Sequence, residues 1–142
     1  MKNSTIKILT TFASIISICF GVWHFFVPGI WNWYSYIDKS ATELVIAVQA
    51  INVFFSLLLV LLGTANILFV FRKPFDRFST IVILSISTIL WATRLVLQIL
   101  YPQGSQNSII QYSMLFIFIL VLGCFVFSLF LILNQNRLLN KR

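Results

Sequence analysis

The sequence has few charged residues and very few acidic ones. Of its 142 residues only 9% are charged and only 3 are Asp or Glu, whereas 60% are hydrophobic. A soluble domain carries roughly a quarter charged residues, so this composition excludes a soluble globular protein. No Asp or Glu lies well inside an apolar run, which argues against a proton-driven pump.

Cysteine and histidine are equally scarce. Cys19 and Cys124 stand alone in apolar runs with no Cys-x-x-Cys pair, which disfavours thiol redox chemistry and metal–thiolate sites and favours small apolar helix residues. The single histidine, His24, has no metal-ligand cluster around it. An enzyme that uses His24 as a general base near Glu43 is disfavoured, because no nucleophile has a clear partner. We therefore predict no catalytic residue, no metal and no cofactor.

Long apolar runs dominate the rest of the chain, whose mean hydropathy is +1.00. Four of them cover residues 6–26, 44–71, 78–100 and 109–134. Each exceeds the roughly 20 residues that a helix needs to span a bilayer. Lipid offers no hydrogen-bond partner to backbone amides, so the runs must be helical. The sequence predicts a single all-α domain, a membrane-spanning four-helix bundle.

The basic residues lie beside alternate ends of these runs. They are Lys2, Lys7, Arg72, Lys73, Arg77, Arg137, Lys141 and Arg142, whereas the first loop has only Lys39 and the loop at 101–108 has no charge. Cytoplasmic loops carry the excess of Lys and Arg, so we expect a multi-pass protein of the cell membrane with both termini cytoplasmic. This placement explains the net charge of +7 without nucleic acid as a partner. The short connection at 72–77 predicts that the second and third helices are antiparallel neighbours.

The first run carries a stripe of small and polar residues at helical spacing. Its members are Thr10, Ser14, Ser17, Gly21, His24 and Pro28. Residues three and four apart share one helix face, and small residues let membrane helices approach closely. We interpret the part from Thr10 to Gly21 as a packing face. The aromatic-rich stretch at 28–37 is expected to lie at the membrane surface, as a short helix, an anchor or a lid.

Arg94 is a charged residue within a spanning run. Burying it costs between about 3 and more than 10 kcal/mol, so such residues usually face the bundle interior, a cavity or a partner. A rise of about 1.5 Å per residue puts five polar residues in one outer layer. These are His24, Gln49, Asn52, Arg94 and Gln98, which we predict to line an outward-facing ligand-binding pocket. In the alternative, Arg94 extends outward to Glu43 or Asp38.

The end of the first run reads Gly21-x-x-His24-Phe25-x-x-Pro28. This pattern, with the helix count and the aromatic first loop, resembles the DoxX-like proteins, small four-helix membrane proteins of bacteria. The resemblance implies the fold over nearly the whole chain and suggests quinone-linked or respiratory accessory roles. Those relatives often carry a glutamate among glycines in the second helix, whereas residues 49–56 here contain no acid.

Several functions are compatible with these features. The pocket would hold a quinone, a lipid or a small anion, since a cation favours an anionic or carbonyl-bearing ligand. A role as an accessory subunit, with Arg94 facing another membrane protein, is equally compatible. The alternative is a small oligomeric transporter or channel, which the lack of a membrane glutamate disfavours. The abundance of Asn, Ile, Lys and Phe indicates an AT-rich bacterial genome.

Overall fold

The computed structural model describes residues 2–38, 40–102 and 108–139, which form four long helices and one short 3-10 helix. They are α1 (Lys2–Ile30), η1 (Trp33–Tyr36), α2 (Thr42–Phe71), α3 (Arg77–Leu100) and α4 (Ser108–Leu139). All four α-helices are long and apolar enough to cross a membrane. The chain is therefore a membrane-spanning four-helix bundle, which confirms the predicted fold class. The predicted charges of Lys39, Lys141 and Arg142 and most of the uncharged loop at 101–108 fall outside the described residues.

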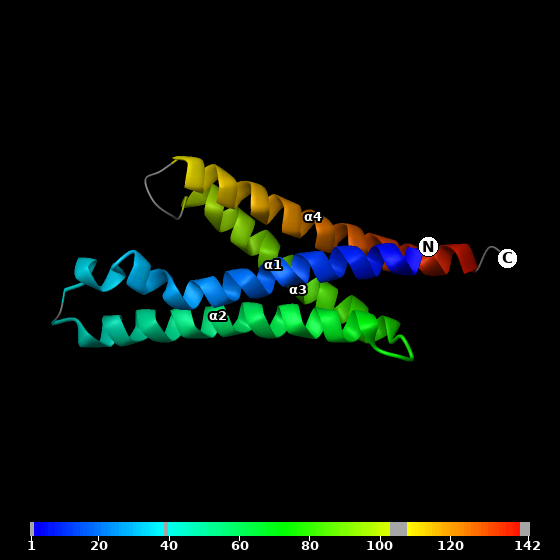
Figure 1. Ribbon diagram of the computed structural model, residues 1–142, viewed down its shortest axis with the longest axis horizontal. Helices are drawn as coiled ribbons and strands as arrows, with labels where there is room; N and C mark the ends of the chain where they lie inside the picture. Colours follow the sequence, from blue (N-terminus) through cyan, green and yellow to red (C-terminus); the bar gives the residue numbers. More distant parts are fainter. Residues whose placement is uncertain (1, 39, 103–107, 140–142) are drawn as a thin grey trace.

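The helices run antiparallel along the bundle. The start of α1, the end of α4 and the α2–α3 connection lie at one end in Figure 1, and η1 lies at the other. We call the first the basic end, because Lys7, Arg72, Lys73 and Arg77 are in the parts of the chain that meet there. The shared end of the termini agrees with an even number of crossings, and its cytoplasmic location stays a prediction.

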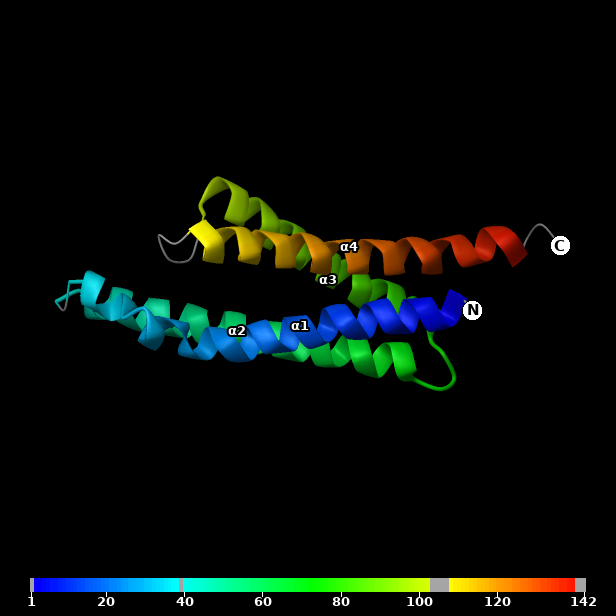
Figure 2. The same ribbon diagram turned by 45° about the horizontal axis from the view of Figure 1, so that its top comes forward.

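The bundle consists of two helical pairs that cross. α1 packs along α2, α3 packs against α4, and α4 also covers part of α1 (Figures 1 and 2). α2 and α3 share much less contact than either pair, because α3 leans away from α2 toward α4. The short connection makes α2 and α3 antiparallel neighbours, as the sequence predicted, although they share less contact than α1 with α2 or α3 with α4.

Close contact between α1 and α2 depends on two glycines. A Cβ atom at Gly63 would lie 2.7 Å from Ile18 Cγ1 and 2.8 Å from the backbone oxygen of Ser14. A Cβ at Gly21 would lie 2.7 Å from the backbone oxygen of Ser56. Real Cβ atoms do not approach other heavy atoms so closely, so both positions require glycine. Each glycine packs directly against the backbone of the opposite helix. This is the packing by small residues that membrane helices use in place of the hydrophobic effect.

The predicted packing face of α1 is buried throughout. Thr10 and Ser14 are 0% exposed and Ser17 is 2% exposed. Gly21, His24 and Pro28 are buried as well. Large apolar side chains such as Phe54, Ile89 and Phe116 project from the outer faces of their helices, where lipid covers them. The burial confirms that the small and polar stripe faces the bundle.

The first helix extends beyond its predicted end. α1 continues from residue 26 through Pro28 to Ile30, and the chain then turns at Asn32, whose φ is 48°. Asn tolerates this left-handed conformation better than most residues, because its short polar side chain bonds locally. η1 follows directly, so the aromatic stretch does contain a short helix.

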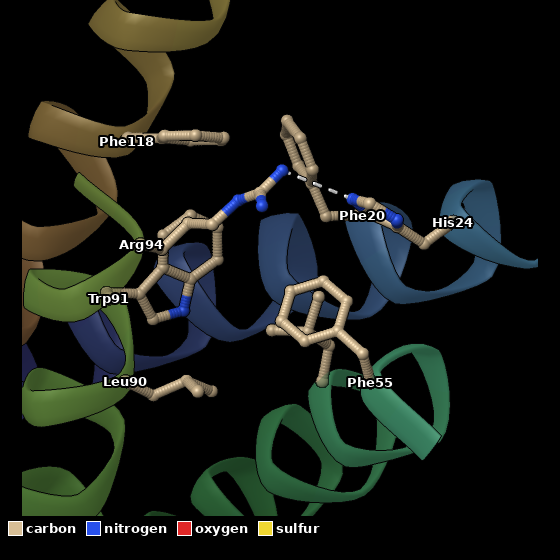
Figure 3. A pocket seen from close by; sticks show the side chains of 8 residues that line it. Phe20, His24, Phe55, Leu90, Trp91, Arg94 and Phe118 are labelled. Atoms are coloured by element: carbon tan, nitrogen blue, oxygen red, sulfur yellow. Dashed lines mark hydrogen bonds between the residues drawn. The ribbon is translucent and has the colours of Figure 1, made fainter. Parts of the chain in front are cut away.

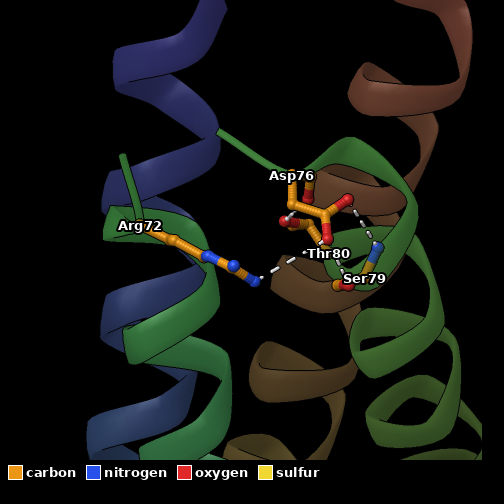
Figure 4. A network of polar contacts seen from close by, with 4 residues as sticks. All are labelled: Arg72, Asp76, Ser79 and Thr80. Atoms are coloured by element: carbon orange, nitrogen blue, oxygen red, sulfur yellow. Dashed lines mark hydrogen bonds and ion pairs between the residues drawn. The ribbon is translucent and has the colours of Figure 1, made fainter. Parts of the chain in front are cut away.

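The basic end is organised around the start of α3 (Figure 4). Asp76 precedes the helix, and its carboxylate accepts hydrogen bonds from the hydroxyl and the backbone N–H of Ser79. Thr80 donates to the Asp76 carbonyl at 2.6 Å, and Arg72 lies 3.9 Å from the carboxylate. The bonds from the Ser79 side chain and backbone lower the pKa of Asp76 from its ordinary 3.8. Asp76 therefore caps α3 in its ionised form.

We expect Gly63→Ala to destabilise the protein, because the added methyl group would force α1 and α2 apart. Overpacking of this kind costs about 1–3 kcal/mol. Gly123→Ala is the matched control, since a Cβ at Gly123 on α4 meets nothing within 4 Å. Thermal unfolding of both variants in detergent measures the difference. Equal midpoints for the two variants would contradict the assigned role of Gly63.

We expect Asp76→Ala to lower the thermal midpoint at neutral pH, because the start of α3 loses its cap. The pKa of the Asp76 carboxyl group is lower in the folded protein than its ordinary value of 3.8. Its ionised form therefore stabilises the fold above pH 3.8, and this stabilisation is lost as the pH falls through the pKa of the folded state. Asp76→Asn keeps a capping oxygen but cannot ionise. Its midpoint should change less than that of the wild type as the pH is taken below 3.8; parallel pH curves would disprove the ionised cap.

Candidate functional site

All four helices contribute to one small pocket in the half of the bundle away from the basic end. Its lining consists of Phe20 and His24 from α1, Phe55 and Leu59 from α2, Leu90, Trp91 and Arg94 from α3, and Phe118 from α4 (Figure 3). The free volume of about 10 Å³ is close to the space of a single water molecule. The walls are mainly aromatic and aliphatic, and the guanidinium of Arg94 and the imidazole of His24 supply the polar groups.

The guanidinium of Arg94 is directed into this pocket. Its Cζ lies 5.4 Å from the ring centre of Phe55 and 5.2 Å from that of Phe118. These distances allow cation–π attraction, which strengthens when the cation is removed from water. Figure 3 shows the guanidinium between the two rings and pointing toward His24. Arg94 therefore lies inside the bundle and is not extended toward Glu43 or Asp38.

The contact with Arg94 sets the chemical form of His24. Arg94 Nη2 lies 3.4 Å from His24 Nε2. Arginine is always protonated and can only donate, so Nε2 must accept and the imidazole is neutral with its hydrogen on Nδ1. The edge-on contact with Phe55, at 4.9 Å between ring centres, holds the imidazole in place. Within the described part of the chain, Nδ1 is buried and has no hydrogen-bond partner.

Three aromatic rings form the floor of the pocket. The ring centres of Phe20, Trp91 and Phe118 lie 5.4–6.0 Å apart in edge-to-face geometry. Trp91 is 2% exposed, and its indole N–H donates to the hydroxyl of Ser17 at 3.0 Å. Ser17 in turn donates to the carbonyl of Ala13 at 2.9 Å. The indole polar group is thus satisfied from α1, which fixes the ring beside Arg94.

Asn52 has a structural partner next to the pocket. Pro28 has no backbone N–H, so the carbonyl of His24, four residues earlier in α1, loses its helical hydrogen bond. The Asn52 side chain of α2 donates to that carbonyl at 2.9 Å. An unpaired carbonyl inside a bilayer is costly, and the amide removes this cost. Asn52 therefore compensates for Pro28 and ties α2 to the backbone of His24.

The predicted site residues are only partly brought together. His24 and Arg94 meet in the pocket, and Asn52 adjoins it through the His24 carbonyl. Gln98 is buried on α3, 4% exposed, but does not line the pocket, and Gln49 lies on an exposed face of α2. The aromatic lining was not among the predicted site residues. Phe20, four residues before His24, could have been found by spacing, whereas nothing distinguishes Phe118 among the many apolar residues of α4.

We expect Asn52→Leu to destabilise the protein by about 1–3 kcal/mol, because it leaves the His24 carbonyl unpaired. Pro28→Ala restores a backbone N–H that can bond to that carbonyl. In a double-mutant cycle, Asn52→Leu should therefore cost less when Pro28 is already Ala, with a coupling of at least about 0.5 kcal/mol. Unfolding free energies in detergent measure the cycle. Strict additivity would show that the two residues do not serve the same carbonyl.

Comparisons with known proteins identified no relative of this chain. No family model, no curated protein and no solved structure matches the chain. The similarity of the Gly21-to-Pro28 stretch to DoxX-like proteins therefore stays a prediction. The assignment of a functional site rests on the geometry of Arg94, His24 and their neighbours.

Proposed function

We propose that this membrane protein binds an amphiphilic ligand whose head group carries a carbonyl or an anionic oxygen, with Arg94 and His24 as the binding pair. The observation that carries the proposal is a guanidinium that enters an aromatic pocket beside an imidazole. Arg94 lies between the rings of Phe55 and Phe118, 3.4 Å from His24 Nε2. A ligand oxygen would accept from the guanidinium, and the neutral imidazole of His24 orients that group.

The charge balance of the chain supports the same class of ligand. Its three acids are Asp38, Glu43 and Asp76, and of these Glu43 lies in the first turn of α2, about 13 Å along the helix from Asn52. The spanning segments thus supply no carboxylate at the depth of Arg94. The two aromatic faces stabilise the guanidinium in part, and an anionic or strongly polarised oxygen would stabilise it further.

The pocket walls favour a ligand with an apolar ring or tail. Phe55 and Leu90 are half-buried and come from α2 and α3, which share less contact than α1 with α2 or α3 with α4. The present volume suits one water, so a head group enters when these side chains change rotamer, as is common on binding. A lipid, a quinone or a similar amphiphile dissolved in the bilayer reaches this position without crossing water.

The proposed orientation puts the site in the outer leaflet of the cell membrane. The basic end carries Lys7, Arg72, Lys73 and Arg77 and by the positive-inside rule faces the cytoplasm. Arg94 lies six residues before the end of α3, a distance of about 9 Å along the helix. The head group would therefore sit below the outer membrane surface, within reach of amphiphiles in that leaflet.

We expect Arg94→Leu to abolish ligand binding and to raise the stability of the unliganded protein, because leucine removes a buried charge. The probes are a short-chain benzoquinone and phosphatidylglycerol, each added to the purified protein in neutral detergent. A ligand at ten times its Kd stabilises the wild type by about 1.4 kcal/mol, which a thermal shift detects. Arg72→Leu is the matched control, since Arg72 is an exposed arginine at the basic end.

The two probes give distinct outcomes. A shift with either probe that is lost in Arg94→Leu and kept in Arg72→Leu supports the site and identifies the head-group chemistry. A shift that survives in Arg94→Leu, or the absence of any shift in the wild type with both probes, would overturn the proposal.

A further inference from the structure

A second polar cluster lies near the basic end, apart from the pocket. Ile6, Val70 and Ile132, from α1, α2 and α4, pack together as one apolar cluster. One helical turn further into the bundle, each helix carries a polar residue, namely Thr10, Asn66 and Ser128. We call these three residues the polar layer. Thr10 and Ser128 are 0% exposed and Asn66 is 1% exposed.

The orientation of Asn66 is determined by its two donated hydrogen bonds. Its Nδ2 donates to the carbonyl of Leu62 at 2.9 Å and to the hydroxyl of Ser87 on α3 at 2.6 Å. A carbonyl can only accept, so the amide nitrogen must face Leu62 and the oxygen Oδ1 faces away from it. Among the described residues, Oδ1 has no hydrogen-bond partner.

The hydroxyls of the polar layer are in the same condition. Thr10 Oγ1 and Ser128 Oγ are buried, and neither has a hydrogen-bond partner in the described part of the chain. Buried polar atoms are nearly always satisfied, and an unsatisfied one within a bilayer is especially unfavourable. The three unsatisfied oxygen atoms of the polar layer come from three helices, and each lies one helical turn from the same apolar cluster. This arrangement points to one hydrogen-bond partner that all three share.

The chemistry of the polar layer selects that partner. Asn66 Oδ1 can only accept, so the partner must donate, and the two hydroxyls can either donate or accept. No Asp or Glu lies in the adjoining helix segments, so a cation would leave its charge uncompensated in a medium of low dielectric constant. An anion would be repelled by Oδ1. The remaining candidate is a neutral molecule with both donors and acceptors.

We infer that the polar layer is a binding site for internal water, which bridges Asn66 Oδ1 to the hydroxyls of Thr10 and Ser128. The bridge joins α1, α2 and α4, and the Asn66–Ser87 hydrogen bond attaches α3 to it. Apolar residues, among them Ala13, Val121 and Phe125, lie along the helices between this site and the pocket at Arg94. The water site is therefore independent of the proposed ligand.

The test is nuclear magnetic resonance of the full chain in lipid nanodiscs, with threonine methyl groups labelled. We expect a water-to-methyl cross-peak of the sign typical of long-lived water at Thr10. Thr64 is the matched control, because it lies on an exposed face of α2 and its hydroxyl already donates to the Val60 carbonyl at 2.8 Å. Its methyl group reports any signal that arises from hydroxyl exchange alone.

Asn66→Leu removes the acceptor and should abolish the cross-peak at Thr10. If that variant does not fold, Ser128→Ala removes one hydroxyl with little change in shape and should weaken the cross-peak. A Thr10 signal no stronger than that of Thr64 would overturn the inference. A Thr10 signal unchanged in the variant that folds would also overturn it.

Discussion

The close approach of α1 and α2 is the contact on which the rest of the bundle depends. Gly21 and Gly63 each face the backbone of the opposite helix at a distance that no larger residue allows. In lipid this contact brings no hydrophobic gain, so dispersion between closely fitted surfaces must supply the attraction. The contact sets the register of the two helices. It thereby brings Asn52 to the His24 carbonyl near one end and aligns Asn66 with Thr10 near the other.

A second constraint is the lack of water in the bilayer core, which makes every buried polar group require a partner. The protein meets it with side chains that link helices. The amide of Asn52 replaces the N–H that Pro28 lacks, the indole of Trp91 uses Ser17, and Asn66 donates to Ser87. Each bond joins residues far apart in the sequence, so the polar groups that the bilayer penalises become the groups that specify helix pairing.

Arg94 meets the same constraint in a different way. The spanning segments contain no carboxylate at its depth, and the guanidinium is placed between the rings of Phe55 and Phe118 with its N–H near His24. Aromatic faces attract a cation and hold the guanidinium within the pocket. An oxygen-bearing ligand would interact with the guanidinium there, and this links the packing of the bundle to the proposed function.

The sequence by itself determined the helix count, the four spans and the buried face of α1, because hydropathy and helical periodicity are local properties that the bilayer turns directly into structure. It also singled out Arg94 and His24. Only the tertiary structure decided that Gln49 is exposed, that Asn52 serves a backbone carbonyl, and that rings from α1, α2 and α4 surround Arg94. The structure also revealed that Asn66 is buried and bonded to Ser87, which its place in a strongly apolar helix did not predict. These features depend on the tilt and register of helices that are distant in the chain, which side-chain packing sets and no local pattern encodes.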